Sequence, residues 1–308
     1  MSQEMVSIVL SLYNPNLNYL KLQLQSIDAQ DYDLIEVVLW DDYPQSTLTE
    51  SHIAQMITRF PFRYIRCDKN LGYIKAFEKL TTLAHGKYIA YCDQDDIWHP
   101  NKISTCVRIM QEEHALLVTS DRREIDQDGN ILISSVKKER PDIVYSWETG
   151  DHITDKAAFG CFALGMTIVM DTETARKAIP FPECTGHDKW LALCASAMGK
   201  VAFCNEPLVD YRRHGHNVTG MFNGVSCKKD YFQDRIACSY EMAQEFVSRF
   251  PDCPDNATIL SFAKARLKRN PFQILKYRAL APKIALFESV TAWLPNFCFK
   301  LIIKILAK

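Results

Sequence analysis

The sequence of 308 residues lacks several features that would place a chain in a familiar class. Its eleven cysteines form no C-x-x-C pair, which argues against a zinc knuckle and favours reduced thiols over a disulfide framework. No apolar run reaches the roughly 18 residues that a membrane-spanning helix needs. The net charge of −1 gives no general case for nucleic-acid binding, and no internal repeat or low-complexity segment is present. These absences leave a globular protein with a full core as the expectation.

What the chain does have is an uneven distribution of charge. Residues 258–308 contain ten lysines and arginines against one acid, Glu288, so this segment carries +9 and leaves about −10 for residues 1–257. Lysines interleave with apolar residues in 270–308, a pattern typical of helices on an anionic lipid surface. The alternative is that these helices pack on the protein with an exposed lysine edge. We expect a body, residues 1–225, and a basic amphipathic helical extension, residues 226–308.

Short apolar segments alternate with amphipathic ones over most of the body. Residues 6–12 and 35–40 read as strands, and 16–29 reads as a helix between them, which implies parallel strands. Further strands are expected at 62–65, 88–92, 115–120, 201–204 and 208–211, and a loop at 134–157. The order predicts an α/β fold with a mainly parallel mixed sheet flanked by helices.

One acidic stretch stands out, residues 87–100, which read KYIAYCDQDDIWHP. A buried strand is expected to end at Cys92, and Asp93, Asp95 and Asp96 follow it directly. Three neighbouring carboxylates repel one another and lose water there, so a divalent cation such as Mg²⁺ or Mn²⁺ would stabilise them. In open α/β sheets the carboxyl ends of strands are where ligands bind. The alternative is an acidic surface turn, since Asp is common in turns. Pro100 is placed to open the helix that follows.

A second informative stretch, residues 185–191, reads TGHDKWL and is expected to open a helix. Asp188 lies in the first turn, where the helix dipole favours a carboxylate. By pattern alone it is equally a helix cap or a catalytic carboxylate. His187 either orients Asp188 or is a partly exposed histidine.

The segment YIAYCDQDDIWHPNKI resembles the acidic D-x-D signature of family 2 glycosyltransferases, and is most similar to bacterial members that build rhamnose-containing or other surface polysaccharides. Three further segments follow the family in the same order: SLYN at 11–14, DD at 41–42, and HDKW at 187–190 followed by RxHGxN at 212–217. The resemblance covers residues 5–220 and implies a GT-A (nucleotide-diphospho-sugar transferase) fold. The family continues its second motif with Gly, whereas Tyr43 follows Asp42 here, so this turn is expected to differ.

The resemblance also implies roles for individual residues. Asp188 would be the general base of an inverting transfer. Nucleotide-sugar contacts are implied for Leu12, Tyr13, Asn14, Asp41, Asn70, Gly72, Lys75, Asp93, Gln94, Asp95 and Arg212. Metal ligands are implied to come from Asp93, Asp95, Asp96 and His214.

The activity implied is metal-dependent transfer of rhamnose or another hexose, from dTDP-rhamnose or a UDP-hexose as the donor. The acceptor implied is a hydroxyl of a lipid-linked glycan, in the synthesis of capsule, O-antigen or cell-wall polysaccharide. A cytoplasmic location at the inner face of the membrane is expected. The alternative is a non-catalytic sugar-nucleotide-binding or membrane scaffold protein. A nucleotidyltransferase is disfavoured, because no Gly-rich phosphate loop follows the first strand.

Overall fold

The computed structural model describes residues 3–140, 147–214, 222 and 224–306. The chain forms two compact units: an α/β unit, Met1–Asp151 and Cys161–His214, and a helical unit, His152–Gly160 and Gly215–Lys308. The segment His152–Gly160, which lies within the body expected at residues 1–225, therefore belongs to the helical unit.

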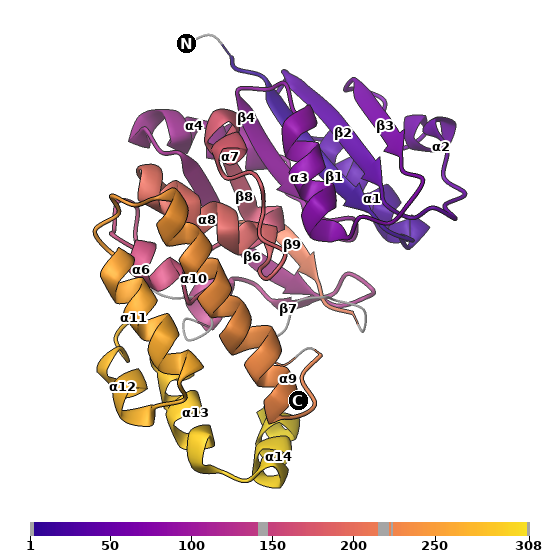
Figure 1. Cartoon of the computed structure of the whole chain (residues 1–308). Helices are drawn as coiled ribbons and strands as arrows, with labels where there is room; N and C mark the ends of the chain where they lie inside the picture. The colour runs from indigo at the N-terminus through magenta and orange to yellow at the C-terminus, as the bar shows by residue number, and fades with distance from the viewer. Residues whose placement is uncertain (1–2, 141–146, 215–221, 223, 307–308) are drawn as a thin grey trace. The chain divides into compact units, whose positions relative to one another are not determined.

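A single mixed sheet organises the α/β unit, in the order β3-β2-β1-β4-β8-β6-β9-β5, with β7 beside β6 (Figure 1). The first four strands of this order are mutually parallel, β8 runs against them, and β6 and β9 resume their direction. The strands are β1 (Val6–Leu12), β2 (Ile35–Asp41), β3 (Phe62–Arg66), β4 (Tyr88–Cys92), β5 (Ile97–Trp98), β6 (Leu117–Ile125), β7 (Ile131–Ile133), β8 (Ile168–Asp171) and β9 (Val201–Arg212).

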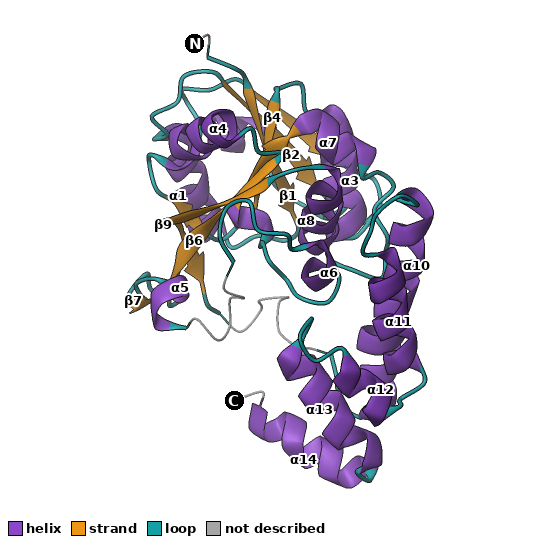
Figure 2. Ribbon diagram, turned by 90° about the vertical axis from the view of Figure 1, so that its left-hand side faces the viewer, coloured by secondary structure: helices purple, strands orange, loops and turns teal. Residues whose placement is uncertain are grey.

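Helices cover both faces of this sheet, with α1 and α4 on one side and α3, α7 and α8 on the other (Figure 2). Strand β4 is therefore buried along its whole length, as expected of a parallel strand between two helical layers. The helices of this unit are α1 (Leu17–Asp28), α2 (Glu50–Ala54), α3 (Tyr73–Leu83), α4 (Lys102–Glu113), α5 (Val136–Glu139), α7 (Thr172–Lys177) and α8 (His187–Met198).

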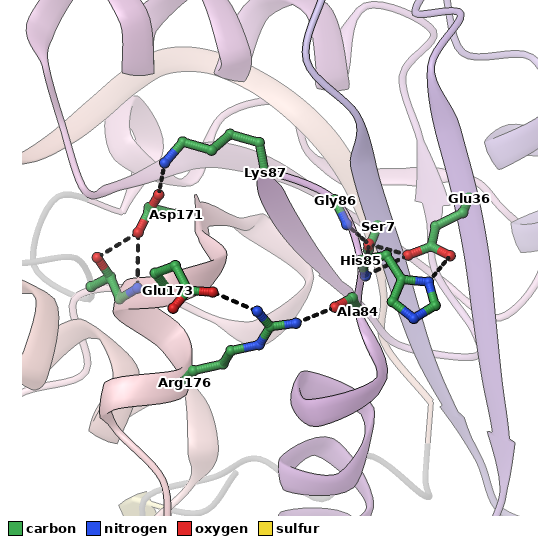
Figure 3. A network of polar contacts seen from close by, with 10 residues as sticks. Ser7, Glu36, Ala84, His85, Gly86, Lys87, Asp171, Glu173 and Arg176 are labelled. Atoms are coloured by element: carbon green, nitrogen blue, oxygen red, sulfur yellow. Dashed lines mark hydrogen bonds and ion pairs between the residues drawn. The ribbon is translucent and has the colours of Figure 1, made fainter.

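Polar groups at the amino edge of the sheet bond to one another (Figure 3). The Ser7 hydroxyl donates to Glu36 at 2.5 Å and accepts from the Gly86 amide at 2.7 Å. A Cβ at Gly86 would lie 2.6 Å from the Met5 carbonyl oxygen, so only glycine fits this turn. Lys87 pairs with the Asp171 carboxylate at 2.6 Å. The polar groups drawn in Figure 3 are thus paired with one another.

Three details of the predicted elements were wrong. Residues 201–212 form one strand, β9, because its pairing with β6 continues past Pro207 with a shift in register. The Ile97–Trp98 pair, for which no strand was expected, forms β5 against β9 before the expected helix begins at Lys102. The loop expected at 134–157 contains the short helix α5 and, in the helical unit, α6 (Thr154–Ala157); residues 141–146 lie outside the described part.

The helical unit packs around a buried ion pair as well as apolar side chains. Arg266 and Glu288, 3% and 4% exposed, are joined by bonds of 2.7–3.1 Å, and the Tyr231 hydroxyl donates to Glu288 at 3.0 Å. Its main helices are α9 (Lys228–Tyr231), a π-helical segment (Phe232–Ala237), α10 (Cys238–Arg249), α11 (Asn256–Leu267), α12 (Pro271–Lys276), α13 (Pro282–Trp293) and α14 (Asn296–Leu306). Within the described residues, no helix is long and apolar enough to cross a bilayer.

Candidate active site

The carboxyl ends of β1, β2 and β4 bring three of the predicted motifs to one edge of the sheet. The parallel register pairs Leu12 with Asp41, and it pairs Leu10 with Cys92, so the residues that follow each strand are neighbours. This is the position at which open α/β sheets bind ligands.

Gln94 joins the acidic turn to the turn after β1. Its side-chain oxygen accepts from the Tyr13 amide at 2.9 Å, and its side-chain nitrogen donates to the Tyr13 carbonyl at 3.3 Å. Asn14 adopts a left-handed backbone (φ 42°), and Leu12 is fully buried. The ring of Tyr13 is half exposed, at 51%, and stands edge-on to Tyr43. Gln94 therefore fixes this turn, and its contact with a nucleotide sugar stays a prediction.

Asp41, at the end of β2, is fully buried. Its carboxylate accepts from the Tyr64 hydroxyl at 2.5 Å and from the Tyr43 amide at 3.2 Å. Burial, followed by the hydrogen bond to Asp41, raises the pKa of Tyr64, so this phenol keeps its proton and remains a donor. The carboxylate is thus fixed at the place where the resemblance puts the nucleotide.

Asp42 has a role that the sequence reasoning missed. Its carboxylate accepts from the amides of Leu71 at 2.9 Å and Gly72 at 2.8 Å, and Asn70 also accepts from Gly72 at 2.7 Å. Gly72 has a φ of 78° and immediately precedes α3, so Asp42 shapes the start of that helix. The signal was available in the combination of a second Asp after β2 with an N-x-G turn.

Lys75 lies one turn into α3. Its ammonium pairs with Glu78 at 3.1 Å and approaches the Phe181 carbonyl at 3.5 Å. Glu78 thus neutralises the positive charge of Lys75 within the protein. The contact of Lys75 with a diphosphate stays a prediction.

The acidic turn after β4 holds its carboxylates in an unfavourable state. Burial, then the charges of Asp95 and Asp188, raise the pKa of Asp93 to about 7. Burial also raises the pKa of Asp96 well above its usual range. One oxygen of Asp96 accepts from the Arg212 amide at 3.0 Å, and its other oxygen has no partner among the described residues. The protein by itself therefore does not stabilise the charged forms of Asp93 and Asp96.

The end of β9 closes over this turn. His214 Nε2 lies 2.7 Å from Oδ2 of Asp95, and the Arg212 guanidinium donates to the carbonyl oxygens of Asp95 at 2.9 Å and Asp126 at 3.1 Å. Arg212 is only 1% exposed. Its side chain braces the acidic turn, while its predicted contact with the donor stays untested.

Asp93, Asp95 and His214 fit a hard divalent cation in kind, since they offer carboxylate oxygens and an imidazole nitrogen. In the described ranges, no three His, Cys, Asp or Glu side chains form a complete metal-binding group. Mg²⁺ and Mn²⁺ commonly take only one or two carboxylates and complete their shell with substrate phosphates and water. The residues present therefore suit a metal that binds together with a diphosphate. Asp96, whose side chain is fully buried, is the least accessible of the predicted ligands.

Asp188 lies in the first turn of α8. Its Oδ1 accepts from the Lys189 amide at 2.7 Å, and its side chain is partly exposed. The ring of the preceding residue, His187, lies 5.5 Å from that of Tyr91, two residues before Asp93 on the same stretch of chain, and the charge of Asp188 contributes to the raised pKa of Asp93. The roles of Asp188 as base and of the acidic turn as metal site stay predictions.

His187 follows neither alternative expected from the sequence. It is 5% exposed, and its ring stacks on Phe77 with centroids 4.0 Å apart. Neither ring nitrogen has a partner among the described residues, so the side chain does not orient Asp188. Burial lowers the pKa of His187 to about 4, so the imidazole is neutral near pH 7. The motif at residues 185–191 could not predict this burial, because Phe77 and Tyr91 lie far from His187 along the chain.

The mixed sheet, with an acidic turn at its carboxyl edge, is typical of one class, the nucleotide-sugar transferases of α/β fold. The family model Glycosyl transferase family 2 matches residues 7–164, and the chain belongs to this family. A relative named as an uncharacterized glycosyltransferase of Nostoc sp. is 26% identical over 80% of this chain and 75% of its own. Another, from Methanocaldococcus jannaschii, is 31% identical but covers 43% of this chain and 46% of its own.

Solved structures share the fold. S. aureus TarS in complex with UDP-GlcNAc has a TM-score of 0.60 at 14% identity, over 94% of this chain and 89% of that one. The mannosyltransferase PcManGT of Pyrobaculum calidifontis, in complex with GDP-Man and Mn²⁺, has a TM-score of 0.53 at 17% identity, over 99% and 80%. The predicted GT-A fold with a helical C-terminal region is confirmed, and the protein is a glycosyltransferase.

Proposed function

We propose that this protein transfers a hexose, with rhamnose as one candidate, from a nucleotide-diphosphate donor to a hydroxyl of a lipid-linked glycan, with inversion at the anomeric carbon. The observation that carries the proposal is that the acidic turn follows β4 at the carboxyl edge of the sheet, and that α8, which begins with His187 and Asp188, packs its first ring 5.5 Å from that of Tyr91 in β4. A base beside a diphosphate site is the arrangement that direct displacement requires.

The chemistry follows from these positions. The acceptor oxygen attacks the anomeric carbon, the bond from that carbon to the diphosphate oxygen breaks, and Asp188 takes the proton of the acceptor hydroxyl. Mn²⁺ or Mg²⁺, held by Asp93, Asp95 and His214 with Asp96 behind them, would offset the charge of the departing diphosphate. Tyr13, Asn14 and Asp41, together with the Asn70–Gly72 turn, would hold the nucleotide.

The nucleotide-sugar part of the proposal is supported by the solved neighbours, which bind UDP-GlcNAc, UDP and GDP-Man. The use of a divalent cation is supported by the Mn²⁺ bound to PcManGT. The choice of dTDP-rhamnose or a UDP-hexose comes from the resemblance of the acidic motif.

A lipid-linked acceptor is supported by the surface of the helical unit. Phe297, Leu301 and Ile305, spaced by four residues along α14, are 66%, 59% and 72% exposed. Trp293, at the end of α13, is 72% exposed. Exposed Lys300 and Lys304 adjoin this row, and such a mixture suits the interface of an anionic bilayer. We place the enzyme at the inner face of the cell membrane.

A thermal-shift screen of the full chain against nucleotide sugars, each with and without Mn²⁺, tests the proposal. Binding to the native state raises the melting temperature by mass action. We expect a rise that needs Mn²⁺ with a dTDP- or UDP-sugar, and release of labelled sugar from that donor. A shift with no turnover would favour a non-catalytic nucleotide-sugar-binding protein. No shift with any donor would overturn the proposal.

A further inference from the structure

A small pocket within the helical unit carries more positive than negative charge. The described residues that line it include three cations and a single acid, which are Lys228, Arg266, Arg269 and Glu288, so the net charge is +2. Its volume is about 40 Å³. Because one water-sized group needs roughly 10–15 Å³, about three such groups fit and a sugar ring does not. The pocket therefore suits a small anionic group whose remainder stays outside.

Two of the four charges cancel each other within the protein. Glu288 accepts from Nη2 of Arg266 at 2.7 Å and from the Tyr231 hydroxyl at 3.0 Å, and these three side chains are buried. The carboxylate is thus committed to this pair. The positive charge that the pocket offers to a ligand comes from Lys228 and Arg269.

Arg269 follows α11, and its guanidinium lies over the ring of Phe232, 4.1 Å from the ring centroid. Its backbone is left-handed (φ 52°), which is uncommon for residues other than glycine, and its side chain is exposed. The contact with the ring uses the face of the guanidinium and leaves the N–H groups at its edge directed away from the ring. These donors are placed to bind an oxyanion.

Lys228, the first residue of α9, reaches the end of α13. Its ammonium donates to the Leu294 carbonyl and lies 3.5 Å from the Ala292 carbonyl, and these oxygens fix its position without neutralising its charge. Burial, followed by the charge of Arg269, lowers the pKa of Lys228. Two cations that line one pocket repel each other, so an anion bound between them would stabilise both.

A phosphate monoester matches this pocket in size and in charge. Such a group carries about −1.5 to −2 at pH 7 and presents three terminal oxygens. These values correspond to the net charge of the lining and to the number of water-sized groups that fit. Ammonium and guanidinium groups form strong hydrogen bonds with phosphate oxygens. A diester carries less charge and has a second substituent for which the pocket has no room.

The helices that line the pocket also carry exposed apolar side chains. Ala292 and Phe299 belong to the lining, whereas Trp293 and Phe297, one and two residues away from them along the chain, are 72% and 66% exposed. A phosphate at the end of a lipid brings an apolar remainder that can contact such side chains, and a free phosphate does not. The lipid is therefore the better match.

We propose that this pocket binds the phosphate monoester headgroup of a membrane lipid, with Lys228 and Arg269 donating hydrogen bonds to the phosphate oxygens. The proposal deepens the membrane location given under the proposed function, and it is independent of the catalytic step. General attraction of lysines to a membrane depends on surface charge. The pocket adds a distinction between headgroups of different chemistry.

Co-sedimentation of the full chain with phosphatidylcholine vesicles tests this distinction. The vesicles contain either phosphatidic acid, a phosphate monoester, or phosphatidylglycerol, a diester, in amounts that give equal surface potential. The ratio of the two affinities then removes the general attraction to charge. We expect a ratio of about ten in favour of phosphatidic acid, equivalent to about 1.4 kcal/mol. Equal affinities would overturn the proposal and leave only a charged surface.

Arg269→Gln should reduce the ratio to near one, because it removes one of the two phosphate donors. Lys228→Gln, which keeps an N–H donor for the Leu294 carbonyl, should act in the same direction. Lys268→Gln is the matched control, since Lys268 is exposed, adjoins Arg269 and does not line the pocket. It should weaken binding to both vesicles and leave the ratio unchanged. An unchanged ratio in Arg269→Gln, or an equal fall in Lys268→Gln, would overturn the assignment.

Glycerol 3-phosphate distinguishes a lipid from a soluble ligand. In excess, it should weaken binding to phosphatidic acid vesicles and leave binding to phosphatidylglycerol vesicles unchanged. If it raises the melting temperature while the vesicles show no preference, the ligand is a soluble phosphate monoester and the lipid assignment is wrong. No binding to any anionic vesicle would contradict the membrane location as well as this proposal. Failure of the catalytic proposal is a separate result, namely no donor binding or turnover in the unmodified chain.

Discussion

The α/β unit and the helical unit differ in where their polar and apolar groups lie. In the α/β unit, the polar groups drawn in Figure 3 bond one another at the amino edge of the sheet, whereas one Asp96 oxygen in the acidic turn and the Ser120 hydroxyl have no hydrogen-bond partner among the described residues. In the helical unit, the charges of Arg266 and Glu288 are buried and paired, whereas Trp293 is exposed. The edge suits a polar ligand in water, and the helical surface suits an apolar environment.

We expect the largest effect, a loss of catalytic activity, from a change of Asp188 in the α/β unit. Asp188→Asn keeps the shape of the side chain but cannot take a proton, so kcat should fall about 10³-fold, within the range for a lost general base. Melting-temperature shifts with the donor should persist, because donor binding does not need the base. A variant that retains near-normal turnover would refute the role of Asp188.

The next effect concerns the buried charges of the helical unit. Glu288→Gln leaves the Arg266 guanidinium buried without a counter-charge, and this should cost about 3 kcal/mol in the free energy of unfolding. Urea titration of the full chain measures it. The exposed Glu241→Gln on α10 is the control and should change stability by less than about 0.5 kcal/mol.

The double change Arg266→Met with Glu288→Leu sharpens this result. If the pair is tolerated only because its members neutralise each other, apolar residues of similar size should recover most of the loss. A double variant no more stable than Glu288→Gln would mean that other contacts of these side chains matter more.

Titration of His187 should make the stability of the folded protein depend on pH. Its folded pKa of about 4 lies below the unfolded value near 6.5, so the unfolded state binds more protons between these values. Stability should therefore be complete above pH 6.5 and fall by up to about 3 kcal/mol as the pH drops to 4. The rings of Phe77, Tyr91 and Tyr73 surround the imidazole, and Asp188 is the charged neighbour.

Comparison of unfolding at pH 7 and pH 4.5 measures this dependence. His187→Gln cannot titrate in this range, so its stability should depend less on pH than that of the unmodified protein. Identical pH dependence in both would show that the imidazole is accessible to protons in the folded state.

The smallest effect expected is on the apolar surface. Trp293→Ser and Leu301→Ser should each weaken binding to vesicles that contain anionic lipid by roughly tenfold, since each removes about 1.5 kcal/mol or more of apolar burial. Co-sedimentation with vesicles measures it. Leu132→Ser is the control, because Leu132 is similarly exposed, at 55%, but belongs to the α/β unit. Equal binding by all three variants would contradict a membrane role for this surface.

Local patterns predicted much of the fold and the candidate site. The first four strands, β1 to β4, appear within one residue of their expected bounds, because a buried parallel strand has a continuous apolar composition, whereas β6 runs to Ile125, five residues beyond its expected end. The pattern failed where pairing partners decide the structure, as in β5 and in the continuous β9. It also missed Asp42, which acts through the amides of Leu71 and Gly72, and the buried position of His187.

The sequence by itself determined the first four strands, the position of the acidic turn and the family that the chain resembles. These features depend on residues that are neighbours along the chain. Only the tertiary structure decided that the start of α8 packs on Tyr91, that Gln94 holds Tyr13, and that the Ser120 hydroxyl finds no partner within the described part of the chain. Burial and electrostatic interaction depend on distances in space between residues far apart in the chain, and no local pattern encodes those distances.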